Sequence, residues 1–167
     1  TPSLSLNKSR QLFTNMELEI TISPILQFAP TAVATNKHVV VTIADTLLED
    51  NTTYRVSFGN AVRDLHEGNP FTKYTYTFST GGYFDSLSLE GNVLNASTGI
   101  PDTSGVLVVL YKASENDTAI IRKKPMYAVK PDKGGKFRFE GLPGRDFRLY
   151  AIRDDNNNMM YRSEERR

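Results

Sequence analysis

TTYRVSF, residues 52–58, carries the pattern on which the fold of this chain depends. The large apolar side chains of Tyr54, Val56 and Phe58 occupy every second position of the stretch. Successive side chains of a β-strand point to opposite faces, so this spacing gathers the apolar set on one face. The stretch therefore predicts a strand that packs one face on a core and turns the other face to water.

Before residue 82, the same alternation appears in MELEITI (16–22), HVVVTI (38–43) and TKYTYTF (72–78). After it, a second set of predicted strands comprises SLSLEGNVL (86–94), GVLVVLY (105–111), AII (119–121), PMYAVK (125–130), KFRFEGL (136–142) and FRLYAIR (147–153). In KFRFEGL the apolar Phe137 and Phe139 again alternate with polar residues. GVLVVLY is apolar on both faces, which predicts a central strand.

Turn-rich stretches such as FAPTAVATNK (28–37) and LLEDNT (47–52) separate the predicted strands. No stretch of ten or more residues shows the 3.6-residue apolar period of a helix, so we expect little helix. A chain of 167 residues can form two small domains. We therefore expect an all-β protein made of two tandem antiparallel β-sandwiches, residues 1–82 and 83–167, divided at Gly81 and Gly82.

The composition excludes several classes of function. Lys and Arg total 20 against 19 Asp and Glu, so the net charge is only +1. Neither domain has the excess of basic residues that binding to the phosphates of nucleic acid requires. The chain has no cysteine, which excludes disulfides, thiolate zinc sites and cysteine nucleophiles. No apolar run approaches the roughly 20 residues that cross a bilayer. Because Thr1 and Pro2 stand where a starting Met would be, we expect the interior of a longer gene product, with any export signal or lipid anchor removed.

Several polar and aromatic residues follow one another at a recognisable spacing in the first domain. ISP (22–24) and VTI (41–43) precede LLEDNTTYRVSFGNAVRDLHEGNPF (47–71) and YTFST (76–80). This order resembles the SbsA-type bacterial Ig-like domain, whose pattern is matched by Asn51, Thr53, Tyr54, Asp64, Gly68, Asn69, Phe78 and Thr80. The resemblance covers roughly residues 12–80 and implies an immunoglobulin-like sandwich. The usual first strand of that family is poorly represented before Leu12.

The second domain resembles a different family. LEGNVLNASTGIPDTSGVLVVLY (89–111) and DKGGKFRFEGLPGRDFRLYAIRDDNNN (132–158) are similar to the opening and closing stretches of a prealbumin-like, or carboxypeptidase-regulatory-like, β-sandwich. The tandem order of the two domains is similar to that of envelope lipoproteins of Bacteroidota. It implies an exported protein of the cell envelope, anchored in the outer membrane or placed at the surface. Any membrane association would then depend on an anchor outside this chain.

AVRDLHEGNPF, residues 61–71, groups four polar side chains around one of the two histidines: Asp64, His66, Glu67 and Asn69. A zinc or iron site needs three or four ligands from rigid elements, whereas these lie in one short loop, and His38 is the only other histidine. The resemblance implies instead a structural turn. In that turn Asp64 and Asn69 bond backbone amides and Gly68 takes a positive φ.

The parts of known hydrolytic sites are missing from the sequence. It has no Gly-x-Ser-x-Gly elbow, no phosphate-binding loop, no dinucleotide-binding glycine pattern and no His-Glu-x-x-His motif. A carboxypeptidase-regulatory-like fold does not bring the zinc ligands of the peptidase with it. We therefore expect no enzyme and no catalytic residues.

RDDNNNMMY, residues 153–161, is the one stretch with the spacing of a cation loop. Asp154, Asn156 and Asn158 alternate as in a calcium-binding loop, and Glu165 stands at the twelfth position from Asp154. The sixth position, which is glycine in such loops, is Met159. The stretch therefore predicts either a solvated turn or a structural Ca²⁺ site, and Ca²⁺ is the only cofactor considered.

Exposed aromatic rings can also stack on sugars. Tyr54, Tyr74 and Tyr76 lie on the inward register of their strands, whereas Phe71, Tyr83 and Phe84 lie out of register near the domain boundary. These three side chains either pack between the domains or form a glycan-binding platform.

We therefore expect a non-enzymatic structural or adhesion-type interaction module of a bacterial cell-envelope lipoprotein, with an unidentified protein or glycan partner. The alternative is a carbohydrate-binding accessory module of an outer-membrane glycan-uptake system.

Overall fold

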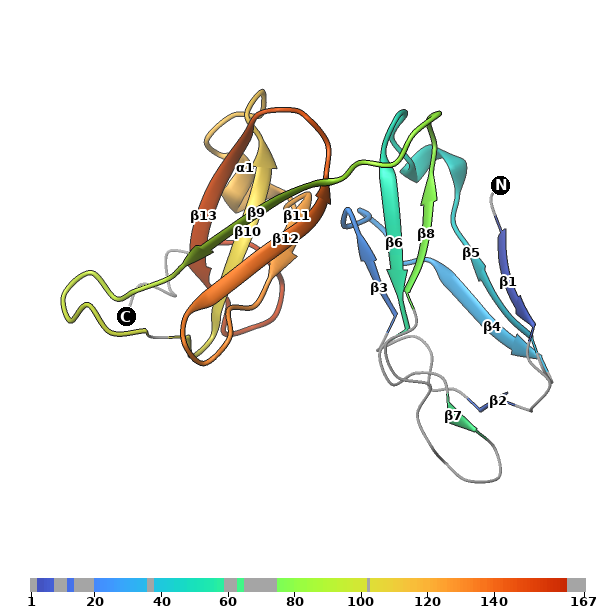
Figure 1. Cartoon of the computed structure of the whole chain (residues 1–167), viewed down its shortest axis with the longest axis horizontal. Helices are drawn as coiled ribbons and strands as arrows, with labels where there is room; N and C mark the ends of the chain where they lie inside the picture. Colours follow the sequence, from blue (N-terminus) through green and yellow to red (C-terminus); the bar gives the residue numbers. More distant parts are fainter. Residues whose placement is uncertain are drawn as a thin grey trace. The chain divides into compact units, whose positions relative to one another are not determined.

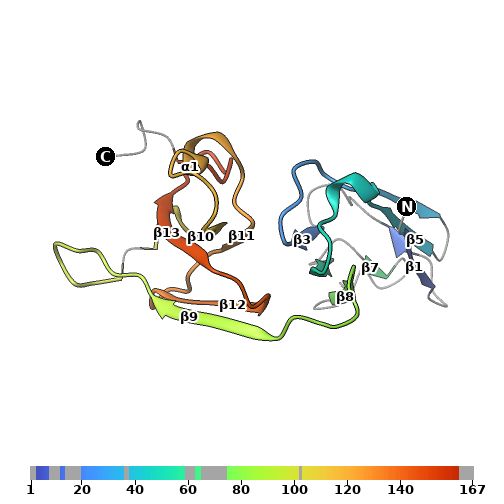
Figure 2. The same cartoon turned by 90° about the horizontal axis from the view of Figure 1, so that it is seen from above.

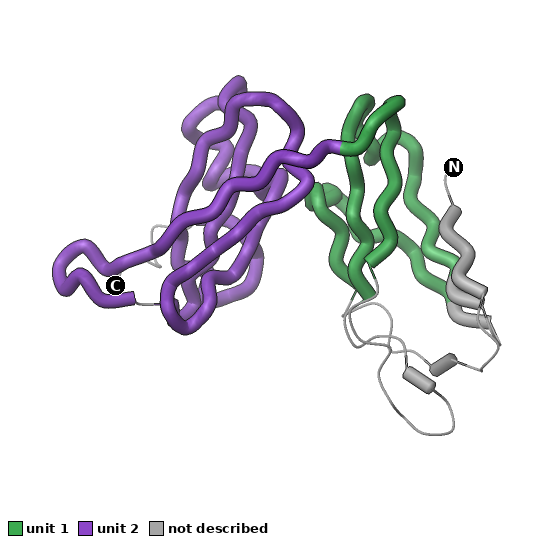
Figure 3. The backbone as a smooth tube through the Cα atoms, in the orientation of Figure 1, with its two compact units in different colours: residues 1–84 green, residues 85–167 purple. Residues whose placement is uncertain are grey.

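The computed structural model describes residues 3–7, 12–13, 20–35, 38–58, 63–64, 75–101 and 103–161. The chain divides into two compact units, Thr1–Phe84 and Asp85–Arg167 (Figure 3). The sequence placed the boundary after Gly82, and the structure places it after Phe84. Within the described ranges, no helix combines the length and the apolar character needed to cross a membrane.

The first unit contains two three-stranded antiparallel sheets and a short strand pair (Figure 1). One sheet has the order β1-β5-β4, formed by Ser3–Asn7, His38–Thr42 and Thr31–Thr35. The other has the order β3-β6-β8, formed by Thr21–Ser23, Thr53–Ser57 and Thr75–Ser79. The pair consists of β2 (Leu12–Phe13) and β7 (Arg63–Asp64), and the 3₁₀ turn η2 spans Asp45–Leu47.

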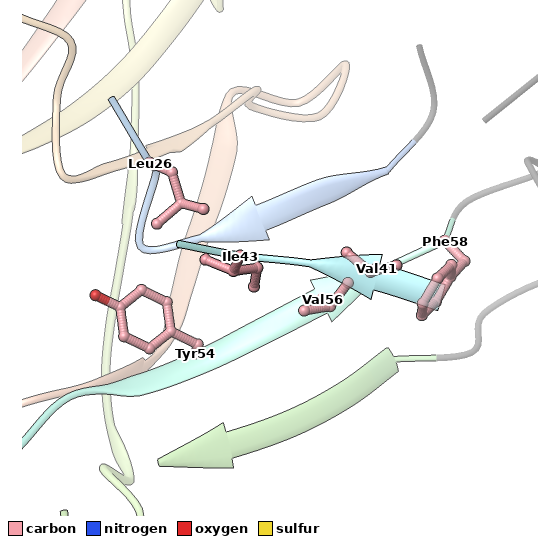
Figure 4. Close-up of a cluster of buried hydrophobic side chains, with 6 residues drawn as sticks. All are labelled: Leu26, Val41, Ile43, Tyr54, Val56 and Phe58. Atoms are coloured by element: carbon pink, nitrogen blue, oxygen red, sulfur yellow. The ribbon is translucent and has the colours of Figure 1, made fainter. Parts of the chain in front are cut away.

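The core of the first unit is formed by side chains from both sheets and the turns beside them. Figure 4 shows its six buried residues: Leu26, Val41, Ile43, Tyr54, Val56 and Phe58. Tyr54, Val56 and Phe58 are the alternating apolar residues of TTYRVSF, and each is at most 1% exposed. The inward face predicted for this strand is therefore confirmed.

Two expectations for the first unit were wrong. Residues 28–37 were expected to form a turn but contain β4, which pairs with β5 through Val33 and Val40. Val33, the one large apolar residue of TAVAT, remains 54% exposed, so the stretch carries no clear strand signal. A strand was also not expected before Leu12, yet β1 pairs with β5 over its whole length. Of the strand expected at 16–22, residues 16–19 lie outside the described residues, and β3 begins at Thr21.

The second unit has two antiparallel layers (Figure 2). One layer has the order β11-β10-β13, formed by Tyr127–Val129, Val106–Lys112 and Phe147–Arg153. The other pairs β12 (Lys136–Leu142) with β9 (Leu87–Asn92). The apolar stretch GVLVVLY forms β10, which lies between β11 and β13 as predicted.

Burial of β10 on both faces explains its unbroken apolar sequence. Val108 and Leu110 belong to a core cluster that includes the β12 residues Phe137 and Phe139. The intervening residues form a second cluster: Leu107, Val109 and Tyr111, together with Ala119 and Ile152. Because neither face of β10 meets solvent, no alternate position of the strand has to be polar.

The second of these clusters is covered by a helix that the sequence did not predict. AII, residues 119–121, was expected to be part of a strand but forms the first three residues of α1 (Ala119–Arg122). Three residues are too few to show a period. The preceding turn decides the conformation, since the Ala119 N–H donates to the Asn116 carbonyl at 2.8 Å. Even with this helix the chain is nearly all β, and its antiparallel sheets are consistent with Ig-like sandwiches, so the predicted fold class is confirmed.

Candidate functional site

The loop that follows β13 carries the strongest coordinating residues predicted from the sequence. The Asp154 side chain is buried, with 8% of the residue exposed. Its Oδ1 accepts the Asn158 N–H at 2.9 Å, and its Oδ2 accepts the Met159 N–H at 3.1 Å. The Asp154 N–H donates to the Gly105 carbonyl at 2.8 Å. Asp154 thus joins the loop to the start of β10.

The two asparagines of the predicted calcium motif also accept backbone hydrogen bonds. Asn156 Oδ1 accepts the Asn158 N–H at 3.0 Å, and Asn158 Oδ1 accepts the Met160 N–H at 2.8 Å. Asn157 and Met159 have φ of 57° and 62°, a conformation that these nearby acceptors help to hold. The motif therefore forms a chain of side-chain-capped turns.

This loop has a structural role in the second unit. Met159 and Tyr161 pack against the cluster that contains Leu107 and Val109. The Tyr161 N–H donates to the Ile120 carbonyl of α1 at 2.9 Å. The same oxygens could ligate a cation, so the Ca²⁺ site at Asp154, Asn156 and Asn158 stays a prediction; Glu165 lies outside the described residues. No group of three His, Cys, Asp or Glu side chains converges anywhere in the described ranges, this loop included.

The corner AVRDLHEGNPF is described only at β7. Leu12 pairs with Asp64 in the β2-β7 ladder. His66, Glu67, Gly68 and Asn69 lie outside the described residues. Both hypotheses for this corner, a structural turn braced by Asp64 and Asn69 or a metal or acid-base site at His66, stay predictions.

A second polar corner, which sequence reasoning did not single out as a unit, is fully described. The Thr80 hydroxyl donates to the Glu49 carbonyl at 2.6 Å, and its oxygen accepts the Thr52 N–H at 3.0 Å. The Thr80 N–H donates to the Thr52 carbonyl at 3.1 Å. Thr52 is fully buried, and its hydroxyl donates to the Asp50 carbonyl at 3.0 Å. These bonds tie the turn before β6 to the end of β8, so Thr80, one of the residues behind the Ig-like resemblance, is a structural brace.

Tyr111, at the second core cluster, has a perturbed pKa. Its hydroxyl donates to the Lys123 carbonyl at 2.9 Å, and its ring meets Tyr150 edge to face at 6.1 Å. Burial, and to a lesser degree the negative charge of Glu115 and the neighbouring Tyr150, raise the pKa of Tyr111 to about 12. The folded state therefore favours the protonated phenol.

Tyr111 makes the stability of the second unit sensitive to alkaline pH. The folded pKa exceeds the ordinary value of 10.0, so the stabilisation is complete below pH 10 and is lost as the pH rises toward 12. We expect wild type to lose up to about 2 kcal/mol more than Tyr111→Phe over this interval. Urea unfolding of both proteins at a series of pH values checks this, because the other tyrosines cancel in the difference. Parallel pH profiles would contradict it.

The aromatic residues at the unit boundary are exposed. Tyr83 and Phe84 are each 62% exposed, and Leu87, at the start of β9, is 56% exposed. Phe71 lies outside the described residues. Tyr54 is buried and Tyr76 is partly buried, as the inward register predicted; Tyr74 lies outside the described residues.

The β9-β12 layer also bears a groove on its outer face, which the sequence did not reveal. It has a volume of about 590 Å³ and is lined mainly by polar residues of two distant segments: Glu90, Gly91, Asn92, Asp132, Lys136, Phe137 and Arg138. Arg138 bonds Glu90 at 3.3 Å and Glu140 at 2.9 Å. Only the cross-strand register of β9 and β12 brings these side chains together.

Comparison with known proteins finds a family similarity for one part of the chain. Residues 8–80 match the family model of the bacterial Ig-like domain. Searches of curated proteins and of solved structures each find no match. The matched range includes the strands β3, β6 and β8 and ends at the Thr80 brace. Residues 8–80 are therefore similar to a bacterial Ig-like domain, as the resemblance over residues 12–80 predicted, and such a domain favours a structural or surface role over catalysis.

Proposed function

We propose that this chain is a non-enzymatic structural or adhesion-type interaction module of a bacterial cell-envelope lipoprotein. The match of residues 8–80 to the bacterial Ig-like domain is the observation that carries the proposal. The second unit contributes a prealbumin-like sandwich in the same role, on the strength of its sequence resemblance.

In the described residues, buried or closely bonded polar side chains hold turns, and this supports a structural function. Thr52, Thr80 and Asp154 carry polar side chains that are buried or closely bonded. Each is bonded to backbone amides or carbonyls that hold a turn. Sandwiches braced in this way tolerate variation in their exposed loops, and those loops are available to partners.

Surface labelling tests the proposed location. Antibodies raised against the purified chain should label intact cells that express the full-length protein, without permeabilisation. Mass spectrometry of the membrane-associated protein should find a lipidated cysteine at its mature N-terminus. Labelling that appears only after permeabilisation, or a mature protein without lipid, would contradict the corresponding part of the proposal.

A second candidate, a carbohydrate-binding accessory module of a glycan-uptake system, is favoured by one observation. Tyr83 and Phe84 expose two adjacent aromatic side chains, a common stacking surface for sugars. Titration of the chain with soluble glycans should then show saturable binding that Tyr83→Ala and Phe84→Ala abolish. Phe28→Ala is the matched control, because Phe28 is 71% exposed and lies in the loop before β4. Equal binding by all three variants would exclude the aromatic platform.

A further inference from the structure

We infer that the groove on the outer face of β9 and β12 is a weak binding subsite for a neutral saccharide. This inference rests on the carbohydrate-binding candidate function and assigns it a site other than Tyr83 and Phe84.

The shape of the groove follows from the strand register. Glu90 pairs with Arg138, Gly91 with Phe137, and Asn92 with Lys136. Residues two apart on a strand are separated by about 6.7 Å and point to the same face. The first and third pairs therefore form two polar walls on the outer face, and the middle pair forms a floor between them.

The floor carries no outward side chain. Phe137 is 8% exposed and packs into the core beneath the layer. A Cβ added at Gly91 would lie 2.8 Å from the Phe137 ring, so glycine is needed here for the ring to pack. Because this middle pair faces the core, neither of its residues projects a side chain between the walls.

The two walls differ in how far their polar groups are satisfied. In one wall, Arg138 is held by Glu90 and Glu140. In the other, the Asn92 carboxamide and the Lys136 ammonium have no side-chain partner among the described residues. Asp132 also lines the groove, and its Oδ1 accepts the N–H groups of Gly134 and Lys136 at 2.8 and 2.9 Å. No bond to its Oδ2 is found within the described part of the chain.

The hydrogen-bonding groups that line the groove indicate which class of ligand fits it. The groove offers a carboxylate oxygen that only accepts, an ammonium that only donates, and a carboxamide that does both. Each sugar hydroxyl also both donates and accepts, so neighbouring hydroxyls can satisfy all three groups. Two acidic side chains, Glu90 and Asp132, balance the two basic ones, Lys136 and Arg138, and so the groove gives a strongly charged ligand no net attraction.

The affinity should be low. Phe137 is the one aromatic residue of the lining, and it is only 8% exposed because it packs in the core cluster, so it offers little surface for stacking. A few solvent-exposed hydrogen bonds give a dissociation constant on the order of millimolar at best. Such binding suits a module whose attachment is strengthened by many copies on one surface.

Nuclear magnetic resonance titration of the whole chain tests the inference. The probes are neutral gluco-, galacto- and manno-oligosaccharides. We expect one series to cause saturable amide shifts in residues 90–92 and 136–138. Asn92→Ala and Lys136→Ala should weaken the binding about tenfold, whereas Lys130→Ala, an exposed lysine outside the groove, should leave it unchanged.

Two results would overturn the inference in different ways. Saturable shifts confined to Tyr83 and Phe84 would retain the carbohydrate-binding candidate and exclude the groove. The absence of saturable shifts with every probe would exclude both. Surface labelling of intact cells tests the proposed cell-envelope location separately, so neither result decides that proposal.

Discussion

Replacing Tyr54 with alanine should lower the free energy of unfolding of the first unit by about 3–5 kcal/mol, the usual cost of removing a buried aromatic ring. Tyr54 is 1% exposed in the core cluster of this unit and stacks on Phe78 at 5.4 Å between ring centroids. Its hydroxyl oxygen also accepts the Glu49 N–H at 2.8 Å. The substitution therefore removes core packing and one contact that holds the turn before β6. Chemical denaturation followed by tyrosine fluorescence and circular dichroism measures the loss.

Tyr54→Phe is the matched control. It keeps the ring and removes only the acceptor for the Glu49 N–H, so it should cost about 1 kcal/mol. If the alanine variant were no less stable than the phenylalanine variant, the ring would not be part of a packed core. The assignment of TTYRVSF as an inward-facing core strand would then fail.

Asp154→Ala should have the second largest effect, about 3 kcal/mol on the second unit. The buried carboxylate accepts the N–H groups of Asn158 and Met159, and hydrogen bonds to charged groups contribute about 1.5–3 kcal/mol each without adding fully. Its removal also releases the loop that places Met159 on the core. Urea unfolding of the variant and of wild type measures the change.

The neighbouring acid provides the control for this experiment. Asp155 is exposed, so Asp155→Ala should change the stability by no more than about 0.5 kcal/mol. Equal losses in both variants would contradict a specific role for the Asp154 carboxylate.

The same two proteins test the predicted calcium ion. A structural Ca²⁺ would raise the unfolding temperature of wild type when calcium replaces a chelator, and Asp154→Ala would not respond. No response in wild type would exclude the ion and leave the hydrogen-bonding role of Asp154 intact.

Strands that bury one face on a large core could be predicted from the sequence. TTYRVSF, KFRFEGL and FRLYAIR correspond to β6, β12 and β13 with little or no change of limits. In TTYRVSF and KFRFEGL, bulky apolar residues alternate with polar ones, because one face meets the core and the other meets water. FRLYAIR lacks this alternation, since Leu149 is 46% exposed while Ile152 is buried, and its apolar content alone predicted the strand. The central position of β10 could be predicted as well, since its sequence is apolar on both faces.

Elements that bury little surface could not be predicted. The edge strand β4 exposes Val33 and contributes only small side chains to the sheet, so it resembles a polar connection. The helix α1 buries Ala119 but exposes Ile121, and four residues hold too little pattern to separate a helix from a strand. In both cases tertiary contacts, rather than local sequence, fix the conformation.

The two candidate sites also differ in how far the sequence could predict them. The Asp-x-Asn-x-Asn spacing identified the loop after β13, but it could not predict what the oxygens contact, since backbone amides and a cation use the same lone pairs. The groove left no local signal. Asn92 and Lys136 are far apart in the sequence, and an alternating charged residue on a strand usually faces only water.

Hydrogen exchange in the whole chain measures most directly whether the two units have separate cores. Tyr54→Ala should speed exchange of the protected amides in β5 and β6 and leave those of β10 and β12 at wild-type rates. Leu110→Ala, which removes a fully buried side chain of the second unit, should do the reverse. Faster exchange throughout both units in either variant would contradict the account of two independently packed β-units.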